Sequence, residues 1–296
     1  MDLAVRNSHS RDSSIEFFKE SHQYKITRGE KSEFSPVSVT SFCKRYFTQF
    51  NPRSVVERHF DKWKVNPNSK YYAVIHAALQ SGSSEEEVKQ MIMDMWVGIG
   101  NKASEEGTDM HDRAEHVCNG IQAPVEDKEM SLLVQWQRDF QPHMKWRPFR
   151  TEWMLWWDEP RLDGKVLVAG TLDLLLRSET TGEFALVDFK RTNPNPKYNG
   201  GPPNLLGPCA NPRYHPGYAS SPLVDLEDSK YGAYCMQLNI LAKMLRERYE
   251  IDVGHNMYLL QMHVDMDQAH CIRVPSHRQA TNTLFVVESE RVSERV

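Results

Sequence analysis

The fold is decided by residues 166–192, which read VLVAGTLDLLLRSETTGEFALVDFKRT. Residues 166–177 are apolar and rich in branched side chains, and residues 184–191 form a second run of this kind, so the stretch predicts two β-strands. Residues 179–182 between them have the polar and glycine composition of a tight turn. We therefore expect a β-hairpin here.

Two acidic side chains interrupt the apolar character of this hairpin. Asp173 lies in the middle of the first strand and Asp188 near the end of the second. Neighbouring strands lie about 4.8 Å apart, so a suitable register places these carboxylates side by side. Lys190 follows Asp188 by two residues and leaves the strand on the same face. Two carboxylates at this distance repel each other unless a cation lies between them, and their oxygens suit Mg²⁺ or Mn²⁺.

The sequence G-T-L-D, followed by a hairpin and V-D-F-K, resembles the core of the PD-(D/E)XK nucleases. The most similar branch is the RecB-like one, which includes the mitochondrial genome maintenance exonucleases. Its first aspartate often follows a G-T-hydrophobic sequence, as Asp173 does here. The resemblance implies a restriction-endonuclease-like α/β core, in which helices flank a central mixed β-sheet. The alternative interpretation is an apolar hairpin that carries two exposed acids and a lysine.

A second motif lies upstream, within residues 100–120. Thr108 follows Gly107 and is expected to cap a helix that carries His111 in its first turn and Glu115 on the same face. This pattern resembles the G-T-x-x-H motif of RecB-like nucleases, which implies that His111 is a metal ligand. The alternative is an ordinary polar helix residue, because the chain contains twelve histidines.

The resemblance implies further site residues. Residues 149–157 are expected to form a strand on which Glu152 lies where the family often has a glutamate near the metals. The expected helix over residues 231–249 carries Gln237 at the position of a Q-x-x-x-Tyr motif, although Leu241 stands where the tyrosine is usual. The implied catalytic set is Asp173, Asp188, Lys190, Glu152 and Gln237. The implied metal ligands are His111, Asp173, Asp188 and the main-chain carbonyl of Phe189.

The rest of the chain divides by composition. Residues 1–100 are expected to form a mostly helical N-terminal region packed on the core, and residues 101–275 the nuclease core. Residues 276–296 are expected to form a C-terminal helix and tail. Eight of the 16 prolines fall within residues 193–229, which predicts an irregular insertion close to the site. Its basic and aromatic side chains suit phosphates and unstacked bases, or else belong to a plain surface loop. They are Lys197, Tyr198, Arg213, Tyr214 and Tyr218.

The bulk properties narrow the class of protein. The five cysteines are scattered and none forms C-x-x-C, so neither a zinc site, a disulfide framework nor a four-cysteine iron–sulfur cluster is expected. A net charge of −4 argues against a protein that coats nucleic acid indiscriminately. No apolar run is long enough to cross a membrane and no secretory signal is evident, so we expect an intracellular protein of the cytoplasm or nucleus. A mitochondrial or virus-encoded protein remains open.

Together with the resemblance, these features predict a metal-dependent exonuclease that uses Mg²⁺ or Mn²⁺. The expected partner is DNA that is single-stranded or has a free end, because the insertion and the helical region would flank the site like the walls of a channel. One alternative is an RNA-cleaving nuclease on the same scaffold. Another is a non-catalytic nucleic-acid-binding subunit, although the intact Asp173, Asp188 and Lys190 argue against it.

Overall fold

The computed structural model describes residues 2–28, 32–34, 36–122, 124, 126–159, 162, 165–194, 206–209 and 216–294. The chain divides into a larger compact unit, residues 1–48 and 110–296, and a smaller unit, residues 49–109. The N-terminal region expected over residues 1–100 thus contributes to both units, and residues 15–18 and 23–28 form strands of the larger one.

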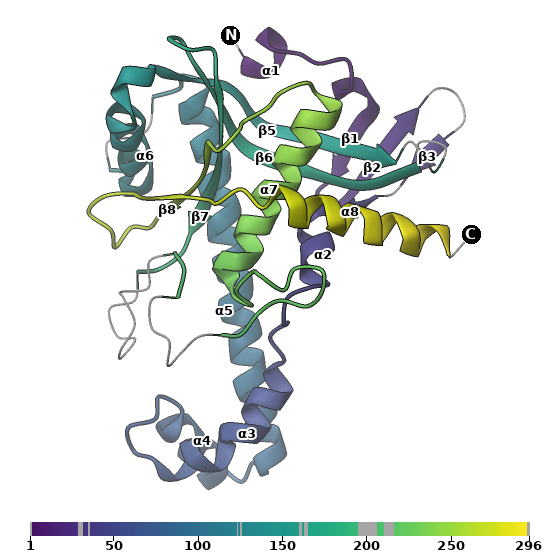
Figure 1. Cartoon of the computed structure of the whole chain (residues 1–296). Helices are drawn as coiled ribbons and strands as arrows, with labels where there is room; N and C mark the ends of the chain where they lie inside the picture. Colours follow the sequence, from purple (N-terminus) through teal and green to yellow (C-terminus); the bar gives the residue numbers. More distant parts are fainter. Residues whose placement is uncertain are drawn as a thin grey trace. The chain divides into compact units, whose positions relative to one another are not determined.

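A mixed sheet, six-stranded in the described residues, forms the centre of the larger unit (Figure 1), in agreement with the predicted α/β class. Its longest members are β5 (Trp146–Glu159) and β6 (Lys165–Ser178), which pair antiparallel along their length. The predicted hairpin is present as β6 and β7 (Phe184–Arg191), also antiparallel. Strand β8 (Met257–Met262) then runs parallel to β7, and β9 (His270–Arg273) antiparallel to β8.

Strand β6 lies at the middle of this arrangement. Its first half pairs in parallel with β4 (Val37–Ser38), and its second half pairs with β7. Because β5 occupies one edge of β6 along its whole length, β4 and β7 share the other edge. The part of β6 that carries Asp173 therefore lies between β5 and β7.

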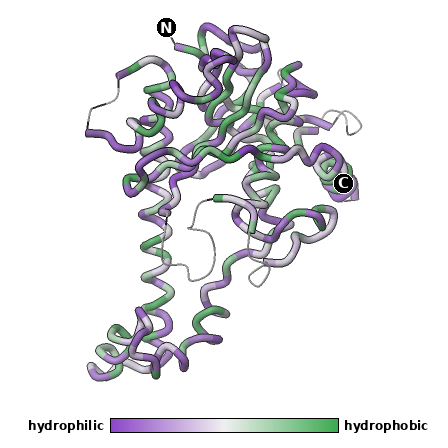
Figure 2. Tube along the Cα trace, turned by 60° about the vertical axis from the view of Figure 1, so that its left-hand side comes forward, coloured by the Kyte–Doolittle hydropathy of each residue, from purple (hydrophilic) through white to green (hydrophobic). Residues whose placement is uncertain are grey.

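Helices cover both faces of the sheet. One apolar cluster joins it to α2 (Val39–Lys44), α7 (Lys230–Arg248) and α8 (Arg278–Ser293), and α7 crosses this face in Figure 1. A second cluster joins the opposite face to α6 (Lys128–Asp139) and to residues 110–118 of α5 (Glu85–Cys118). Strand β7 alternates between the two clusters, since Leu186 packs in the first and Val187 in the second. Figure 2 shows hydrophobic residues along the strands of this unit.

Side chains cap three of these helices at the expected ends. Ser38 accepts a hydrogen bond from the N–H of Ser41 at the start of α2, Asp127 caps α6, and Ser229 caps α7. At the N-terminus, α1 (Leu3–Arg6) precedes a small sheet of β1 (Ile15–Phe18), β2 (Gln23–Arg28) and β3 (Ser32–Phe34). This sheet packs on β5 and β6 through a cluster that includes Ile26 and Trp156.

The smaller unit is helical, as its apolar periodicity predicts. It consists of α3 (Pro52–Val65), α4 (Tyr72–Gln80) and the first part of α5, around a core that includes Phe60, Ile75 and Ile92. Asn51 caps α3, whose first residue is Pro52, and Ser84 exchanges hydrogen bonds with Glu87 at the start of α5.

One predicted helix boundary is wrong. The sequence predicts a helix start at Thr108, whereas α5 is one continuous helix through this position. The Thr108 hydroxyl donates to the carbonyl of Ser104, one turn earlier, so it does not cap a helix. Gly107 lies in this helix at the ordinary cost of a helical glycine, about 1 kcal/mol relative to alanine, which neighbouring residues outweigh. No helix in the described residues combines the length and apolar character needed to span a membrane.

Candidate metal centre

Three side chains from separate elements of the larger unit converge at one place. His111 comes from α5, Glu152 from β5 and Asp173 from β6, and one ligand atom from each lies within 4.8 Å of the others. His111 Nδ1 is 3.5 Å from Glu152 Oε1 and 3.5 Å from Asp173 Oδ2. The structure thus brings together three of the residues that the sequence singled out, and we call them the His–Glu–Asp cluster.

The predicted acid–lysine pair lies on the neighbouring strand β7. Lys190 Nζ is 2.5 Å from Asp188 Oδ2, and both side chains are largely buried. The same ammonium lies 4.6 Å from the centroid of the Tyr234 ring, on α7. No role was predicted for Tyr234 from the sequence. The available signal was its position one turn before Gln237.

The register of the strands aligns the three acids. Thr151 pairs with Leu174 and Trp153 with Leu172, so Glu152 stands opposite Asp173. Leu174 in turn pairs with Val187, and the register continued by one residue places Asp173 opposite Asp188. The acids therefore occupy matching positions on three adjacent strands, because β6 lies between β5 and β7.

Glu152 has an unusual backbone conformation for a strand residue. Its φ of 40° lies in the left-handed region, which costs a non-glycine residue about 1–2 kcal/mol. Thr151 and Trp153 would share one face in a regular strand, yet Thr151 accepts a hydrogen bond from Asn119 just after α5, whereas Trp153 packs in the cluster of α7. The twist at Glu152 therefore reverses the faces of β5 at the point where its carboxylate meets His111.

Main-chain and ring contacts orient the cluster. The N–H of Phe189 donates to Asp173 Oδ2 at 2.6 Å, and the Phe189 ring lies edge-on to the His111 ring with centroids 6.0 Å apart. The Phe189 side chain is buried in the second apolar cluster. One residue of β7 thus contacts two members of the His–Glu–Asp cluster, although its predicted role lay in its carbonyl.

Burial and neighbouring charges shift the pKa values of the site. Burial opposes a charge on His111, but the carboxylates of Asp173 and Glu152 raise the pKa of its imidazole to about 9. Burial raises the pKa of the Asp188 carboxyl to about 6 despite the nearby ammonium of Lys190, and it also raises the pKa of Asp173. The carboxylates of Asp188 and Asp173 outweigh the effect of burial on Lys190 and raise its pKa. Positive charge on His111 and Lys190 therefore offsets part of the negative charge of the three carboxylates.

A buried glutamate connects the elements that carry the site. Glu129 on α6 accepts hydrogen bonds from Arg113 at 2.8 Å and from Arg191 at 2.7 Å, and it is only 2% exposed. Arg113 lies two residues after His111, and Arg191 directly follows Lys190. The carboxylate of Glu129 therefore ties the helix of the histidine to the strand of the lysine. No role was predicted for Glu129 from the sequence.

Other predicted residues lie elsewhere. The side-chain amide of Gln237 is 3.5 Å from the hydroxyl of Thr40. Glu115 faces the Thr151 hydroxyl at 3.5 Å, while the neighbouring Arg113 pairs with Asp127 and Glu129. Among the predicted nucleic-acid contacts, Tyr218 is 64% exposed and forms a β-bridge with Glu227. The other four lie outside the described residues: Lys197, Tyr198, Arg213 and Tyr214.

The donor atoms of the cluster could hold a divalent cation. An imidazole nitrogen and two carboxylate oxygens are common metal-binding groups, and the cluster is partly open to solvent, since the side chains of His111 and Glu152 are 27% and 30% exposed. The ring nitrogen that faces the carboxylates would need to lose its proton to bind a metal. A proton on this nitrogen would therefore compete with the metal.

Comparisons with known proteins add no functional assignment. No family model matches the chain, and no curated protein matches it. The chain is similar to the crystal structure of SSO0001 at 13% sequence identity and a TM-score of 0.32, over 88% of this chain and 78% of that chain. A similarity at this level supports no conclusion about function.

Proposed function

We propose that this chain is a divalent-metal-dependent nuclease that hydrolyses phosphodiester bonds of DNA. The observation that carries the proposal is the convergence of His111, Glu152 and Asp173 beside the Asp188–Lys190 pair. These are the residues to which the resemblance to RecB-like nucleases assigns the chemistry. They come from one helix and three strands, so their meeting does not follow from the hairpin motif alone.

The His–Glu–Asp cluster would hold the metal, with Asp188 alongside. When bound, a divalent ion polarises the phosphate and lowers the pKa of a coordinated water. Carboxylate oxygens suit Mg²⁺ and Mn²⁺, and the imidazole of His111 favours Mn²⁺ between the two. The hydrogen bond from the Phe189 N–H holds the Asp173 carboxylate in position for this role.

Lys190 would act on the reacting phosphate. Its ammonium is held by the carboxylate of Asp188 and the ring face of Tyr234, an arrangement that fixes the position of its charge. From there it would orient the attacking water and offset the negative charge that develops on the phosphorus oxygens. Tyr234 would be a positioning residue, because it contacts the lysine and not the phosphate.

We also propose a preference for DNA ends. It rests on the resemblance to end-dependent relatives and on the insertion that follows Lys190, of which residues 195–205 and 210–215 lie outside the described residues. A linear single strand should be degraded faster than the covalently closed circle of the same sequence. Equal rates would indicate an open, endonucleolytic site.

The test of the proposed function uses end-labelled single- and double-stranded DNA and RNA with purified protein. Cleavage of DNA should require Mn²⁺ or Mg²⁺ and stop in EDTA. Ca²⁺ should support binding but little cleavage, because its coordination is looser. Stronger cleavage of RNA would favour the RNA-nuclease alternative. Tight binding without cleavage in any metal would favour a non-catalytic subunit.

A further inference from the structure

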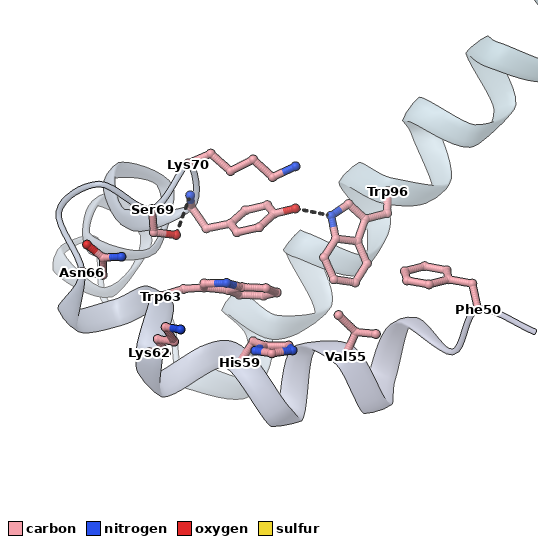
Figure 3. Close-up of a pocket in the computed structure, with 10 residues that line it drawn as sticks. Phe50, Val55, His59, Lys62, Trp63, Asn66, Ser69, Lys70 and Trp96 are labelled. Atoms are coloured by element: carbon pink, nitrogen blue, oxygen red, sulfur yellow. Dashed lines mark hydrogen bonds between the residues drawn. The ribbon is translucent and has the colours of Figure 1, made fainter. Parts of the chain in front are cut away.

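The smaller unit contains an aromatic cavity that the metal centre does not use. Its volume is about 580 Å³, within the range of about 300–1,000 Å³ that is typical of small-molecule sites. Figure 3 shows Trp63 and Trp96 approaching the same space from α3 and α5, with Phe50 beside Trp96. The cavity lies at the edge of the core of this unit, where Trp63 and Trp96 are only partly buried.

The rings of the cavity present flat and perpendicular surfaces. Trp63 stacks on His59 with an angle of 23° between the rings, and Trp96 stands at 90° to Trp63 with centroids 6.1 Å apart. The indole N–H of Trp96 donates to the Tyr71 hydroxyl at 2.7 Å, which fixes the wall of the cavity. The Phe50 ring is 67% exposed and contacts Trp96 edge-on. A planar ligand could stack on one ring while its edge meets another.

The charge at the cavity is positive. Lys62 and Lys70 line it, and no carboxylate is among the lining residues. Neither lysine has an ion-pair partner within the described part of the chain, and Lys70 Nζ instead lies 4.8 Å from the Tyr71 ring. Four other cations of this unit pair with a glutamate, namely Arg53, Lys64, Lys89 and Lys102.

The aromatic rings and the positive charge together decide which class of ligand fits the cavity. Aromatic cages for quaternary ammonium groups bind cations, which Lys62 and Lys70 would repel. Aromatic grooves for proline-rich peptides bind an uncharged backbone and have no need of unpaired lysines. Single-stranded nucleic acid, in contrast, offers flat bases to the rings and phosphates to the ammonium groups.

We propose that this cavity holds an unstacked base of a single-stranded nucleic acid, with Lys62 and Lys70 contacting the flanking phosphates. The choice of a polynucleotide rests on the proposed nuclease function. The base would stack against the exposed Phe50 ring. Because every base has a π-face, the cavity should accept a base of any sequence.

The experiment measures binding of the full chain in EDTA, where the proposed cleavage cannot occur. Fluorescence anisotropy would compare a labelled oligothymidylate with an abasic strand of equal length and charge. The oligothymidylate should bind more tightly to the wild type. Phe50→Ala should weaken its binding by about fivefold to a hundredfold, the range found for base–aromatic stacking, and should leave binding of the abasic strand unchanged.

Substitution of the two lysines should have a different effect on binding. Lys62→Ala combined with Lys70→Ala should weaken binding of both strands. It should also reduce the slope of log K against log salt by about 1.4, since each contacted phosphate of a single strand contributes about 0.7. Matched controls are Phe18→Ala, an exposed phenylalanine of β1, and Lys102→Ala, an exposed lysine of α5 outside the cavity. Neither control should change binding.

Several results would overturn the inference. One is equal binding of the oligothymidylate and the abasic strand by the wild type. Another is unchanged binding of the oligothymidylate by Phe50→Ala. A third is that free thymidine monophosphate or a proline-rich peptide competes as strongly as the oligonucleotide does. A thermal melt would confirm that Phe50→Ala is folded, which is expected because its ring is exposed. Cleavage in Mn²⁺ without base-dependent binding would contradict only the cavity. Base-dependent binding without cleavage would contradict only the proposed nuclease.

Discussion

The main-chain N–H of Phe189 donates a hydrogen bond to the same oxygen of Asp173, Oδ2, that lies 3.5 Å from His111 Nδ1. This one oxygen therefore connects strand β7 to helix α5 across the sheet. The donor belongs to the backbone, so side-chain substitutions in β7 do not remove it. A hydrogen bond of this kind favours the charged carboxylate and offsets part of the effect of burial.

Substitution of the histidine should separate metal binding from folding. His111→Ala should weaken binding of Mn²⁺ by about tenfold to a hundredfold or more, because it removes one of the three proposed ligands. Titration calorimetry measures this. His116→Ala is the matched control, since His116 lies on the same helix but is exposed and faces the Asp112 carbonyl. Equal metal affinity of His111→Ala and wild type would place the metal elsewhere.

The acid–lysine pair should be required for turnover. Asp188→Asn and Lys190→Ala should each lower the cleavage rate by at least about a hundredfold, the effect of removing one electrostatic group from a transition state. Circular dichroism should show a folded protein in both cases. Asp139→Asn, in an exposed ion pair on α6, should cleave at the wild-type rate. An active, folded Asp188→Asn protein would exclude this site as the catalytic one.

The positive φ of Glu152 should lower the stability of the fold while its carboxylate serves metal binding. Glu152→Gly should relieve the positive φ and give a melting temperature at least equal to that of the wild type, while metal affinity falls. Glu152→Gln should lose metal affinity without the gain in stability. Glu250→Gly is the control, because Glu250 has a φ of 58° and is exposed. It should raise stability with unchanged metal binding. A marked loss of stability in Glu152→Gly would refute the assignment of strain.

Asp12 should make stability dependent on acid pH. Burial disfavours a charge on Asp12, but the Arg150 guanidinium and hydrogen bonds from the His9 N–H and the Trp153 indole favour it. Together they hold the pKa of Asp12 below the ordinary value of an aspartate, which is about 4. A group with a lowered pKa in the folded state stabilises the fold above the unfolded-state pKa and loses this effect as the pH falls through the folded-state value.

Asp12→Asn should therefore lower the free energy of unfolding by about 1–3 kcal/mol at pH 7. The difference from wild type should shrink as the pH falls below about 4. Urea denaturation at a series of pH values measures this. Asp267→Asn, at a fully exposed side chain, should change the free energy of unfolding little at any pH. A difference at Asp12 that stays constant with pH would show that shape and not charge matters there.

Removal of the buried glutamate should affect both stability and the metal centre. Glu129→Gln leaves the guanidinium groups of Arg113 and Arg191 without their shared carboxylate, and loss of one partner of a buried ion pair costs about 3–5 kcal/mol. Metal affinity should fall as well, although Glu129 is no ligand. Asp139→Asn on the exposed side of α6 provides the comparison. Wild-type metal affinity in a destabilised Glu129→Gln protein would limit this residue to a structural role.

The sequence predicted those parts of the fold that depend on local pattern. Alternating and continuous apolar runs gave the β6–β7 hairpin nearly residue for residue, because each strand is buried on both faces. The Gly107-Thr108 pair misled the prediction of a helix start, because a local capping signal yields to a helix that is already propagating. Whether such a local signal starts a helix depends on tertiary contacts, which the hydrophobic periodicity of the sequence does not reveal.

Only those residues of the candidate site that belong to a sequence motif could be predicted. His111, Glu152 and Asp173 were identified through resemblance, and the structure brings them together. The positive φ of Glu152 has no sequence signal, since glutamate is a poor residue for that conformation. The contact of Lys190 with Tyr234 was equally inaccessible, because it joins two elements whose relative placement depends on the whole core.

The glycine of the G-T-L-D sequence has a consequence for how such motifs are read. A β-carbon on Gly170 would lie 2.6 Å from Cγ2 of Val39, the first residue of α2, and the φ of Gly170 is not in the left-handed region. Gly170 is therefore required by the close approach of α2 to β6. A chain with a smaller residue in place of Val39 could dispense with the glycine and keep the same chemistry. Searches that demand this glycine would overlook such chains, whereas the acids and the lysine would still identify them.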